Sequence, residues 1–430
     1  MNTIESRAYW SPELYESERE AIFAHAWLFV GHESMIREPG DYVTGFMGDD
    51  PVIVCRGDDG AIGVMLNKCR HRGNKVCLYD KGNAPMFRCS YHGWSYGRDG
   101  ALTGVPMLKE AYAEDFPRET LGLVAAPLVA TYKGLIFATW DPAGPSLEAF
   151  LGPDLLWYWD RLFLDDPAGF EVLPGRHRYL IPGNWKLLAE NFGGDMYHFP
   201  LTHASVIKLN RDGNVKRVLG AAGAAREDTN YSVLCAGAGG APHGLLQVAV
   251  GDGAHRSDLQ QAQALSPDAV AWGEERRRRR LALLSDSPTK PNGFYTANIW
   301  PNLSMNGFGS AIYGRTLLQW IPRGPEQTEV WQWCVVESSA PPEVKRQMAF
   351  ILTHGQAAAG MIAPDDGDNF QRIRDALSTS QARHVNFNYD LASADDERSL
   401  VPELPGQVLP NFTEAYQRAF YRHWRAVVAS

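Results

Sequence analysis

The stretch Cys69-Arg70-His71 is followed, after seventeen intervening residues, by Cys89-Ser90-Tyr91-His92. This pattern, C-x-H-x17-C-x2-H, brings together two thiolates and two imidazoles. A Rieske-type [2Fe–2S] cluster uses this ligand set, with the cysteines on one iron and the histidines on the other. Because neutral histidines replace two thiolates, the reduction potential rises and the cluster can pass single electrons to a second metal. The sequence therefore predicts an electron-transfer domain.

Short β-rich runs flank both ligand pairs. Asp58-Asp59-Gly60 separates two such runs, and Arg98-Asp99-Gly100 separates another two. An Asp-Gly pair between apolar runs is a β-hairpin signal. We therefore expect both ligand pairs to lie at or next to hairpin tips in a small antiparallel domain. Loop tips suit a cluster that must approach another site.

A second group of polar residues lies about a hundred residues further on. The pattern predicts a helix over residues 184–197. Asn191, Asp195 and His198 fall at i, i+4 and i+7, so a helix continued through them would carry all three on one face. These residues are candidates for a second site.

His203 follows His198 by five residues, and Pro200 lies between them. A proline should end or distort the helix, which would let the second histidine swing back and complete a chelating pair. Non-haem Fe(II) oxygenases use two histidines and one carboxylate, with positions left open for O₂. Asp365 and Asp366 are the best downstream donors. Taken alone, these aspartates also fit an acidic helix N-terminus, which the helix dipole stabilises.

The fold class expected is α+β, with a small antiparallel-β domain and a larger domain built on an antiparallel sheet wrapped by helices. Residues 1–38 should form a helical segment, with its helix at 16–30, that packs with the larger domain. Residues 39–145 should form the cluster domain, and residues 146–430 the catalytic domain. A chain of 430 residues is long enough for two such cores.

The net charge of −9 gives no indication of a nucleic-acid partner. The basic run Arg276 to Arg280 is local, and a solvated helix face or subunit contact is favoured over a docking patch for an acidic electron carrier. Six cysteines do not make a disulfide framework, so the four outside the motif are expected to be ordinary buried thiols. No signal peptide or membrane span is visible, and a cytoplasmic protein is expected.

Two other classes of protein fit part of this pattern. Zinc also binds Cys₂His₂ sets, which would make the N-terminal domain a structural binding module. A Rieske electron carrier fused to an inert domain is the other reading. Both account poorly for the second ligand set, because a structural zinc module or an inert domain needs no open iron site.

The chain resembles the large (α) subunits of bacterial Rieske aromatic ring-hydroxylating dioxygenases, of the naphthalene, biphenyl and polycyclic-hydrocarbon branch. The resemblance covers nearly the whole chain, and several independent motifs stand in the right order. These motifs are Cys69-Arg70-His71-Arg72-Gly73, Cys89-Ser90-Tyr91-His92-Gly93-Trp94, Asn184-Trp185-Lys186, Glu190-Asn191-Phe192-Gly193-Gly194-Asp195-Met196-Tyr197-His198, Thr202-His203 and Asp365-Asp366.

The resemblance implies a role for each candidate residue. Cys69 and Cys89 would bind one cluster iron, and His71 and His92 the other. The mononuclear iron would be bound by His198, His203 and Asp366, with Asp365 as the alternative carboxylate. Asp195 would bridge His198 to the cluster histidine of a neighbouring subunit, which implies a trimer. A carboxylate that bonds the other ring nitrogen of a ligand histidine orients the imidazole and raises its basicity toward the metal.

The implied reaction is cis-dihydroxylation of an aromatic ring with O₂. Electrons from NAD(P)H would arrive through a reductase and usually a ferredoxin, and a small β subunit would complete an α₃β₃ assembly, although α₃ members exist. Related Rieske oxygenases carry out monooxygenation or demethylation, and these reactions stay open.

The implied pocket should be mainly apolar. Two of its positions depart from the family pattern, because Gln356 and Ile362 stand where relatives often carry aromatic residues. A polar wall at Gln356 would indicate a substituted or differently oriented substrate, whereas a glutamine pointing to solvent would have no role. The full set of candidate lining residues is Asn191, Phe192, Met196, Phe199, Gln356 and Ile362.

Overall fold

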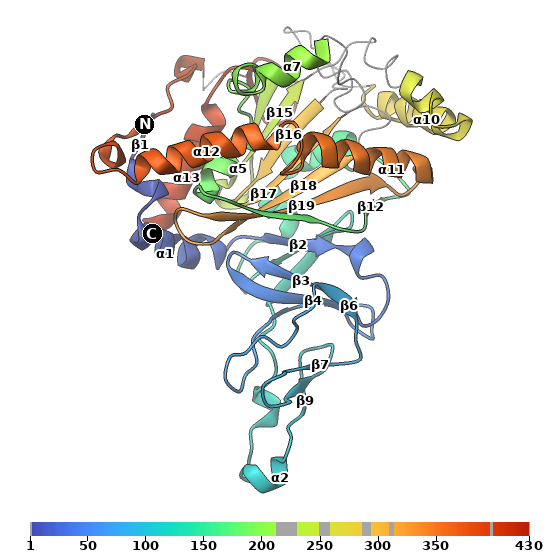
Figure 1. Cartoon of the computed structure of the whole chain (residues 1–430), viewed down its shortest axis with the longest axis vertical. Helices are drawn as coiled ribbons and strands as arrows, with labels where there is room; N and C mark the ends of the chain where they lie inside the picture. The colour runs from blue at the N-terminus through green and yellow to red at the C-terminus, as the bar shows by residue number, and fades with distance from the viewer. Residues whose placement is uncertain are drawn as a thin grey trace. The chain divides into compact units, whose positions relative to one another are not determined.

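The computed structural model describes residues 2–211, 230–248, 259–285, 294–308, 314–395 and 399–429. Contacts divide the chain into two compact units. The small unit is Phe23–Leu147, and the large unit combines Met1–Ile22 with Glu148–Ser430. The small unit is therefore an insertion in the sequence of the large one, as the blue N-terminal colour within the large unit shows (Figure 1).

The N-terminal segment divides at this boundary and is not one helical piece. The helix α1 (Pro12–Glu18) continues as a π-helical turn at Arg19–Phe23 and goes no further. The strand β2 (Leu28–His32) follows and pairs antiparallel with β11 (Leu135–Thr139). The expected helix over residues 16–30 is wrong in its second half. All five residues of β2 are buried, which is typical of a strand covered on both faces.

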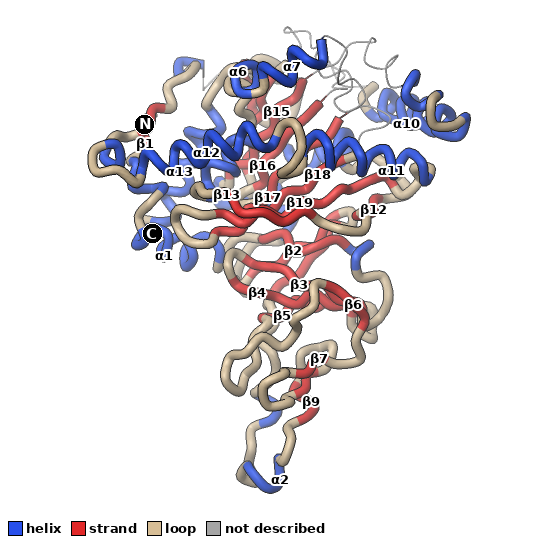
Figure 2. The backbone as a smooth tube through the Cα atoms, in the orientation of Figure 1, coloured by secondary structure: helices blue, strands red, loops and turns tan. Residues whose placement is uncertain are grey.

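The small unit consists of short antiparallel strands joined by loops (Figure 2). Both Asp-Gly signals are confirmed, because β4 pairs with β5 and β8 pairs with β9 across them. The unit contains three sheets, with strand orders β5-β4-β3-β6, β7-β8-β9 and β10-β11-β2. The bounds not yet given are β3 (Asp41–Met47), β4 (Asp50–Arg56), β5 (Ile62–Leu66), β6 (Lys81–Asn83), β7 (Phe87–Arg88), β8 (Ser95–Tyr96), β9 (Leu102–Gly104), α2 (Leu108–Ala111) and β10 (Leu128–Tyr132).

The described residues of the large unit form a nine-stranded antiparallel sheet of order β12-β19-β18-β17-β16-β15-β14-β21, with β13 also paired to β19. A separate short pair joins β1 (Thr3–Ile4) to β20 (Phe387–Asn388). The expected α+β class is confirmed. The sheet strands are β12 (Phe170–Val172), β13 (His177–Ile181), β14 (Tyr231–Ala236), β15 (Pro242–Val248), β16 (Phe294–Ile299), β17 (Leu303–Phe308), β18 (Arg315–Pro322), β19 (Thr328–Glu337) and β21 (Gln407–Pro410).

Helices cover this sheet, with α11 and α12 lying across the face seen in Figure 1. The helix α5 contacts β16, β17 and β18, and α13 contacts β14 and β15. The helices are α3 (Leu147–Leu151), α4 (Pro153–Tyr158), α5 (Trp185–Phe192), α6 (Phe199–Thr202), α7 (Ala204–Arg211), α10 (Pro267–Leu283), α11 (Pro342–Ile351), α12 (Ala363–Leu377) and α13 (Ala415–Val428).

The helix α5 ends earlier than the sequence pattern predicts. Asn184 caps its start by accepting a hydrogen bond from the Lys186 N–H at 3.0 Å. The helix stops at Phe192, because Gly193 caps it and Gly194 adopts a φ of +134°, which favours glycine. The expected helical face through Asp195 and beyond therefore does not exist, and a turn presents these residues instead.

A buried ion pair ties the N-terminal residues to α5. Glu18 and Lys186 form a salt bridge with side chains 1% and 0% exposed. The indole N–H groups of Trp185 and Trp424 also donate to Glu18, each at 2.8 Å. A buried carboxylate with this many donors is well compensated, and removal of Glu18 would leave an uncompensated buried ammonium.

The basic run on α10 is only partly solvated, contrary to the expected exposed face. Arg276 and Arg280 are each 2% exposed and pair with Glu337 at 2.5 Å and Asp165 at 2.9 Å. Arg315 on β18 bridges both carboxylates, at 2.7 Å and 2.8 Å. This five-residue charge network fixes α10 to the sheet.

We expect Glu337→Gln to lower the free energy of unfolding by about 3–5 kcal/mol at pH 7, because it leaves buried guanidinium groups without their carboxylate. Burial alone would raise the pKa of Glu337, but Arg276 and Arg315 outweigh it and lower the pKa to about 2. Its folded pKa thus lies below the unfolded value of about 4.3, so its stabilisation is complete above about pH 5 and is lost as the pH falls toward 2.

Urea denaturation between pH 7 and pH 3 measures this contribution. The variant should show a flatter pH dependence than the wild type in the acid range. Glu275→Gln is the matched control, because Glu275 forms an exposed pair with Arg278 on the same helix and should cost less than about 1 kcal/mol. Equal losses in the two variants would contradict the prediction.

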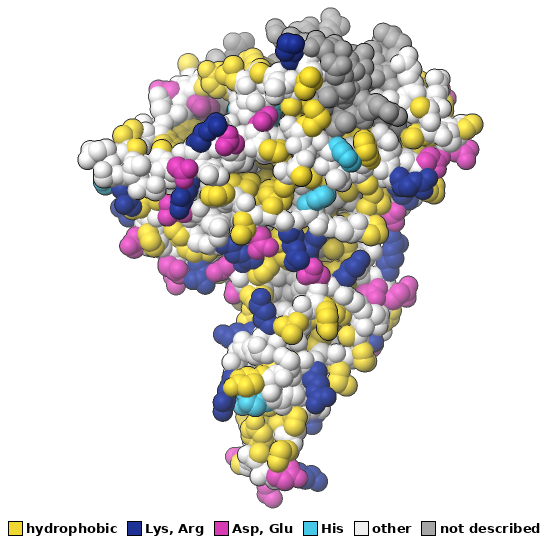
Figure 3. Space-filling model, in the orientation of Figure 1, with side chains coloured by type: hydrophobic (Ala, Val, Ile, Leu, Met, Phe, Trp, Pro, Cys, Tyr) yellow, Lys and Arg dark blue, Asp and Glu magenta, His cyan; other side chains and the backbone are white. Residues whose placement is uncertain are grey.

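On the face of the molecule shown in Figure 3, acidic and basic side chains of the described residues are interspersed, with neither sign gathered into one large patch. Among the described residues, no helix is both long enough and apolar enough to cross a membrane.

Candidate metal centres

Two loops of the small unit carry the cysteine–histidine motifs on nearly the same backbone. In each, the cysteine N–H donates to the carbonyl five residues on, at 2.8 Å for Cys69 and 2.8 Å for Cys89. A glycine four residues after each cysteine donates back to it and has φ of +76° or +75°. The second loop is the tip of the β7–β8 hairpin, as expected. The first lies between β5 and β6, which pair with different strands, so it is not a hairpin tip.

The four candidate side chains come together at these loops. Cys69 and Cys89 are 3% and 2% exposed, and the rings of His71 and His92 have centroids 4.4 Å apart. The Nδ1 atom of His71 is buried and has no hydrogen-bond partner among the described residues. A buried polar atom without a partner is costly, and a metal ligand atom is one explanation for it. The donor set therefore fits a [2Fe–2S] cluster of the Rieske type.

The polypeptide also favours a thiolate at Cys89. Burial alone would raise the pKa of this thiol, but hydrogen bonds from the Tyr91 N–H, from Asn74 and from Cys69 lower it below its ordinary value. The thiolate is the form that binds metals. By contrast, burial raises the pKa of Cys55 to about 11, as expected for an ordinary buried thiol. The four cysteines outside the motif are all buried and free, which confirms that expectation.

Tyr96 is a functional candidate that the motif analysis missed. Its hydroxyl accepts a hydrogen bond from the Arg70 N–H at 3.0 Å and lies 3.2 Å from Cys69 Sγ. The hydroxyl proton is thereby left to donate to the sulfur. A cluster gains negative charge on reduction, so a donor to a ligand sulfur stabilises the reduced state more than the oxidised state.

We expect Tyr96→Phe to lower the midpoint potential of the cluster by roughly 40–60 mV, which corresponds to about 1–1.4 kcal/mol of lost differential stabilisation. Redox titration followed by electron paramagnetic resonance measures the shift. Tyr112→Phe is the control, because Tyr112 belongs to the same aromatic group around Trp94, whereas its hydroxyl makes no hydrogen bond to Cys69 or Cys89 among the described residues. An unchanged potential in Tyr96→Phe would show that its hydroxyl does not tune the cluster.

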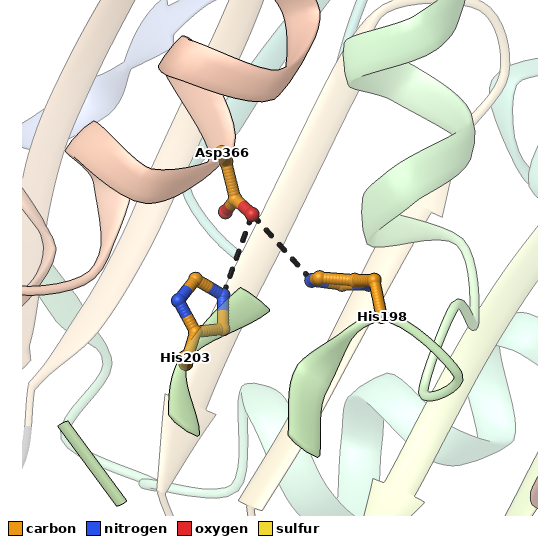
Figure 4. Close-up of side chains that lie close together, drawn as sticks. All are labelled: His198, His203 and Asp366. Atoms are coloured by element: carbon orange, nitrogen blue, oxygen red, sulfur yellow. Dashed lines mark ion pairs between the residues drawn. The ribbon is translucent and has the colours of Figure 1, made fainter. Parts of the chain in front are cut away.

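In the large unit, His198, His203 and Asp366 converge from two separate segments (Figure 4). One ligand atom from each lies within 4.8 Å of the other two. Asp366 Oδ1 is 3.6 Å from His198 Nε2 and 3.3 Å from His203 Nε2. Two imidazoles and one carboxylate form the set that non-haem Fe(II) oxygenases use, and the arrangement fits such an ion.

Each histidine presents its other nitrogen to a second carboxylate. His198 Nδ1 is 3.2 Å from Asp195 Oδ2, and His203 Nδ1 is 3.3 Å from Asp365 Oδ2. We call the Nε2 atoms, which face Asp366, the inner nitrogens, and the Nδ1 atoms the outer ones. Asp365 thus faces the outer nitrogen of His203, while Asp366 faces the inner nitrogens of both histidines. Burial alone would lower the pKa of His198, but Asp195 and Asp366 raise it above its ordinary value. These carboxylates favour positive charge at the site, as a cation site requires.

The short helix α6 brings the two histidines together. His198 precedes it and His203 follows it, so the pair spans one short helical segment. Pro200 lies in the first turn of α6, where its missing N–H costs nothing, so it begins a helix where a helix end was expected. Asp195 Oδ1 accepts the His198 N–H at 3.2 Å, which fixes the approach to this helix.

The six predicted pocket residues are all partly exposed. Phe192 contacts Trp320, with ring centroids 5.2 Å apart, and Phe199 contacts His203 at 5.3 Å. Gln356 accepts a hydrogen bond from the buried Asn306, so its side chain is held inside the unit and does not simply point to solvent.

The fold and the two ligand sets together define an oxidoreductase with a Rieske domain and a catalytic iron domain. A Rieske [2Fe-2S] domain model matches residues 26–133, and a ring hydroxylating alpha subunit (catalytic domain) model matches residues 172–430. The chain belongs to the ring-hydroxylating dioxygenase alpha-subunit family. The cofactors of this family are a Rieske [2Fe–2S] cluster and a mononuclear non-haem iron.

Individual relatives agree along the whole chain. The chain is 35% identical to the benzene 1,2-dioxygenase subunit alpha of Pseudomonas putida, over 99% of this chain and 91% of the relative. It is 34% identical to the biphenyl 2,3-dioxygenase subunit alpha of Rhodococcus jostii, over 99% and 89%. The solved naphthalene 1,2-dioxygenase from a Rhodococcus species superposes with a TM-score of 0.82 at 32% identity, over 99% and 94%.

Proposed function

We propose that this chain is the terminal oxygenase that cis-dihydroxylates an aromatic ring. The observation that carries the proposal is the convergence of His198, His203 and Asp366 in a chain that also carries the Rieske ligand set. The reaction consumes the ring, one O₂, two electrons and two protons, and both oxygen atoms end on adjacent ring carbons. When bound, the cluster supplies single electrons and the mononuclear iron supplies the place where O₂ is activated.

Each candidate ligand has a proposed role in this reaction. Cys69 and Cys89 hold one cluster iron, and His71 and His92 hold the other. The mononuclear iron is held by His198, His203 and Asp366. Asp365 positions the imidazole of His203 from behind, in the manner of a carboxylate–histidine–metal triad. The geometry that supports this division is the 3.3 Å contact of Asp365 with the outer nitrogen.

Asp195 is the proposed link between the two metal centres. It lies 3.2 Å from the outer nitrogen of His198 and its side chain is 30% exposed, so a second imidazole can reach it. We propose that this imidazole is His92 of a neighbouring copy of the chain, which is exposed. This arrangement requires an oligomer, and a trimer of α subunits is the proposed form.

The remaining proposed contribution of the chain is to hold the substrate ring. Asn191, Phe192, Met196 and Phe199 belong to the segment that approaches the iron ligands, and Ile362 precedes the acidic turn of α12. The apolar members of this set, Phe192, Met196, Phe199 and Ile362, would orient an aromatic ring and exclude water. The benzene, biphenyl and naphthalene dioxygenase names of the relatives support a mono- or polycyclic aromatic substrate.

Electrons are proposed to come from NAD(P)H through a reductase and a ferredoxin, and a small β subunit is proposed to complete an α₃β₃ assembly. The designation "subunit alpha" in the relatives' names supports a multi-subunit enzyme. Mass measurement of the chain with and without a co-expressed β subunit tests the assembly.

Metal analysis of anaerobically purified protein is the first test of this function, with zinc measured in the same sample. About three irons and two acid-labile sulfides per chain are expected, one cluster and one mononuclear ion. An aromatic panel with reductase and ferredoxin should then yield cis-diols, and phenols or dealkylated products would instead indicate monooxygenation or demethylation. About one zinc without sulfide would overturn the oxygenase function.

Gln356 is expected to influence where the ring is attacked. Its side-chain oxygen accepts from Asn306 and its carbonyl accepts from Gln332 Nε2 at 3.0 Å, so two buried residues fix its place. Gln356→Phe replaces a polar group by an aromatic one and should change the ratio of product isomers at least about three-fold, since about 1 kcal/mol of altered contact suffices. Chromatography of the diols measures the ratio, and unchanged products would exclude Gln356 from the pocket wall.

A further inference from the structure

A buried hydrogen-bond network crosses the sheet beside α5. Trp320 Nε1 donates to Ser304 Oγ at 2.7 Å, Ser304 Oγ donates to Asn298 Oδ1 at 2.8 Å, and Asn298 Nδ2 donates to the Tyr416 hydroxyl at 2.8 Å. All four side chains are at most 2% exposed. They come from the adjacent strands β18, β17 and β16 and from α13. We call these four residues the Trp320–Tyr416 network.

The ring of Tyr416 occupies the space left by two glycines. A Cβ atom at Gly193 would lie 1.8 Å from a Tyr416 ring carbon, and one at Gly244 would lie 2.5 Å from the ring. The same Gly244 Cβ would lie 2.1 Å from the Gly193 carbonyl oxygen. No residue with a side chain fits at either glycine while the ring is present. The ring therefore fixes the backbone at the end of α5.

Trp320, at the other end of the network, contacts Phe192, the residue before Gly193. The Trp320 ring lies 5.2 Å from the ring of Phe192, which is the last residue of α5. Phe192 and Gly193 are adjacent in the sequence. Trp320 thus packs against the side chain of Phe192, and Tyr416 packs against the backbone of Gly193. Because each polar link is buried and satisfied, displacement at one end is costly at the other.

The segment so held leads directly to Asp195. Gly194 adopts a φ of +134°, and its carbonyl accepts a hydrogen bond from Ser232 Oγ at 3.4 Å. Asp195 follows, with one oxygen on the His198 N–H and the other 3.2 Å from His198 Nδ1. The place of this carboxylate thus depends on the Gly193–Gly194 turn.

We propose that Tyr416 is a positioning residue for Asp195, and that the Trp320–Tyr416 network makes the position of this carboxylate depend on the position of Phe192. The inference rests on the proposed roles of Asp195 and Phe192 in ring hydroxylation. A substrate ring bound against Phe192 would then influence the conformation of the turn that carries Asp195. The substrate and the proposed electron-transfer carboxylate are thereby coupled through the sheet. Such coupling needs a contact that differs between the substrate-bound and substrate-free enzyme, and we assign this role to the Phe192–Trp320 contact.

Three variants test the network on the assembled holoenzyme. Tyr416→Phe keeps the ring and removes the hydroxyl, Ser304→Ala removes the middle link, and the double variant removes both. The readout is product formed per O₂ consumed, a ratio that loss of folded enzyme does not change. Both single variants should lower this ratio about five-fold at unchanged iron and sulfide content. The double variant should be no worse than either single one, because the links act as one unit.

Tyr158→Phe is the matched control. Tyr158 is 1% exposed and donates one hydrogen bond to the Pro405 carbonyl at 3.0 Å, so it loses a comparable buried bond elsewhere in the large unit. Its ratio should equal that of the wild type. Wild-type ratios in both Tyr416→Phe and Ser304→Ala would overturn the proposal, and so would an equal fall in Tyr158→Phe.

A second measurement does not depend on any substrate being oxidised. Tyr416→Leu removes the ring, and hydrogen exchange detected by mass spectrometry should show the amides of residues 193–198 exchanging about ten-fold faster than in the wild type, with Tyr158→Phe unchanged. Unchanged exchange in this segment would overturn the positioning role. If the wild type oxidises no aromatic compound, the proposed function fails, and this exchange measurement alone decides the proposal for Tyr416.

Discussion

Asp195→Asn is expected to keep both metal centres and to lose nearly all turnover. Asparagine can still accept the His198 N–H through its amide oxygen, so the turn before α6 should survive. The variant loses the negative charge that faces His198 Nδ1 at 3.2 Å. A carboxylate in this position orients and tunes the ligand, and its loss typically costs 10–100-fold; the additional loss of the proposed bridge should bring turnover down by about 100-fold or more.

The measurement combines iron and sulfide content with the rate of substrate-dependent oxidation of a pre-reduced cluster. Both metal contents should equal the wild type, while cluster oxidation slows with turnover. Asp368→Asn is the control, because Asp368 forms an exposed pair with Arg372 at 2.5 Å on α12. Normal turnover of Asp195→Asn with an external electron donor would disprove the bridging role.

Asp366→Ala should lose the mononuclear iron and retain the cluster. Its Oδ1 atom faces the Nε2 atoms of both histidines, and without it the described residues supply two imidazoles and no carboxylate on that side. Iron should fall from about three to about two per chain, with sulfide unchanged at about two. No ring oxidation should remain detectable.

Asp365→Ala is the matched comparison one residue away. Asp365 contacts the outer nitrogen of His203, so its loss should weaken iron binding about 10–100-fold without abolishing it. Titration with Fe(II) should restore activity in Asp365→Ala and not in Asp366→Ala. The reverse result would move the iron ligand to Asp365.

The cysteine–histidine motif and the histidine pair could be proposed from the sequence because both depend on short spacings. The Rieske motif needs only two loops, and each loop carries its own glycine at a positive φ. The histidine pair spans five residues, so local geometry brings it together. No spacing in the sequence separates Asp366 from Asp365, and the family resemblance alone favours Asp366. In the structure these adjacent residues on α12 face different nitrogens of His203.

Two parts of the structure lay beyond the sequence pattern. The helix expected through Asp195 ends at Phe192, where Gly193 caps it and Gly194 takes a positive φ. The helical pattern does not show that the Tyr416 ring packs against Gly193. That tyrosine lies on the last helix, and no local spacing connects it with the site. Residues 28–30 fit the apolar period of the helix expected over residues 16–30, whereas the pairing of Leu28–His32 with β11 decides their conformation.

The sequence order of the two units has a consequence for protein engineering. The small unit, which carries the Rieske motif, interrupts the sequence of the large catalytic unit, with junctions at residues 22/23 and 147/148. Exchange of the small unit between relatives therefore needs two cuts, and an N-terminal deletion does not release it intact from the catalytic unit. Deletion of the first twenty-two residues would instead remove Glu18 and leave the Lys186 ammonium buried without its carboxylate in the catalytic unit. A proteolytic cut that removes Glu18 is thus a perturbation of the catalytic unit.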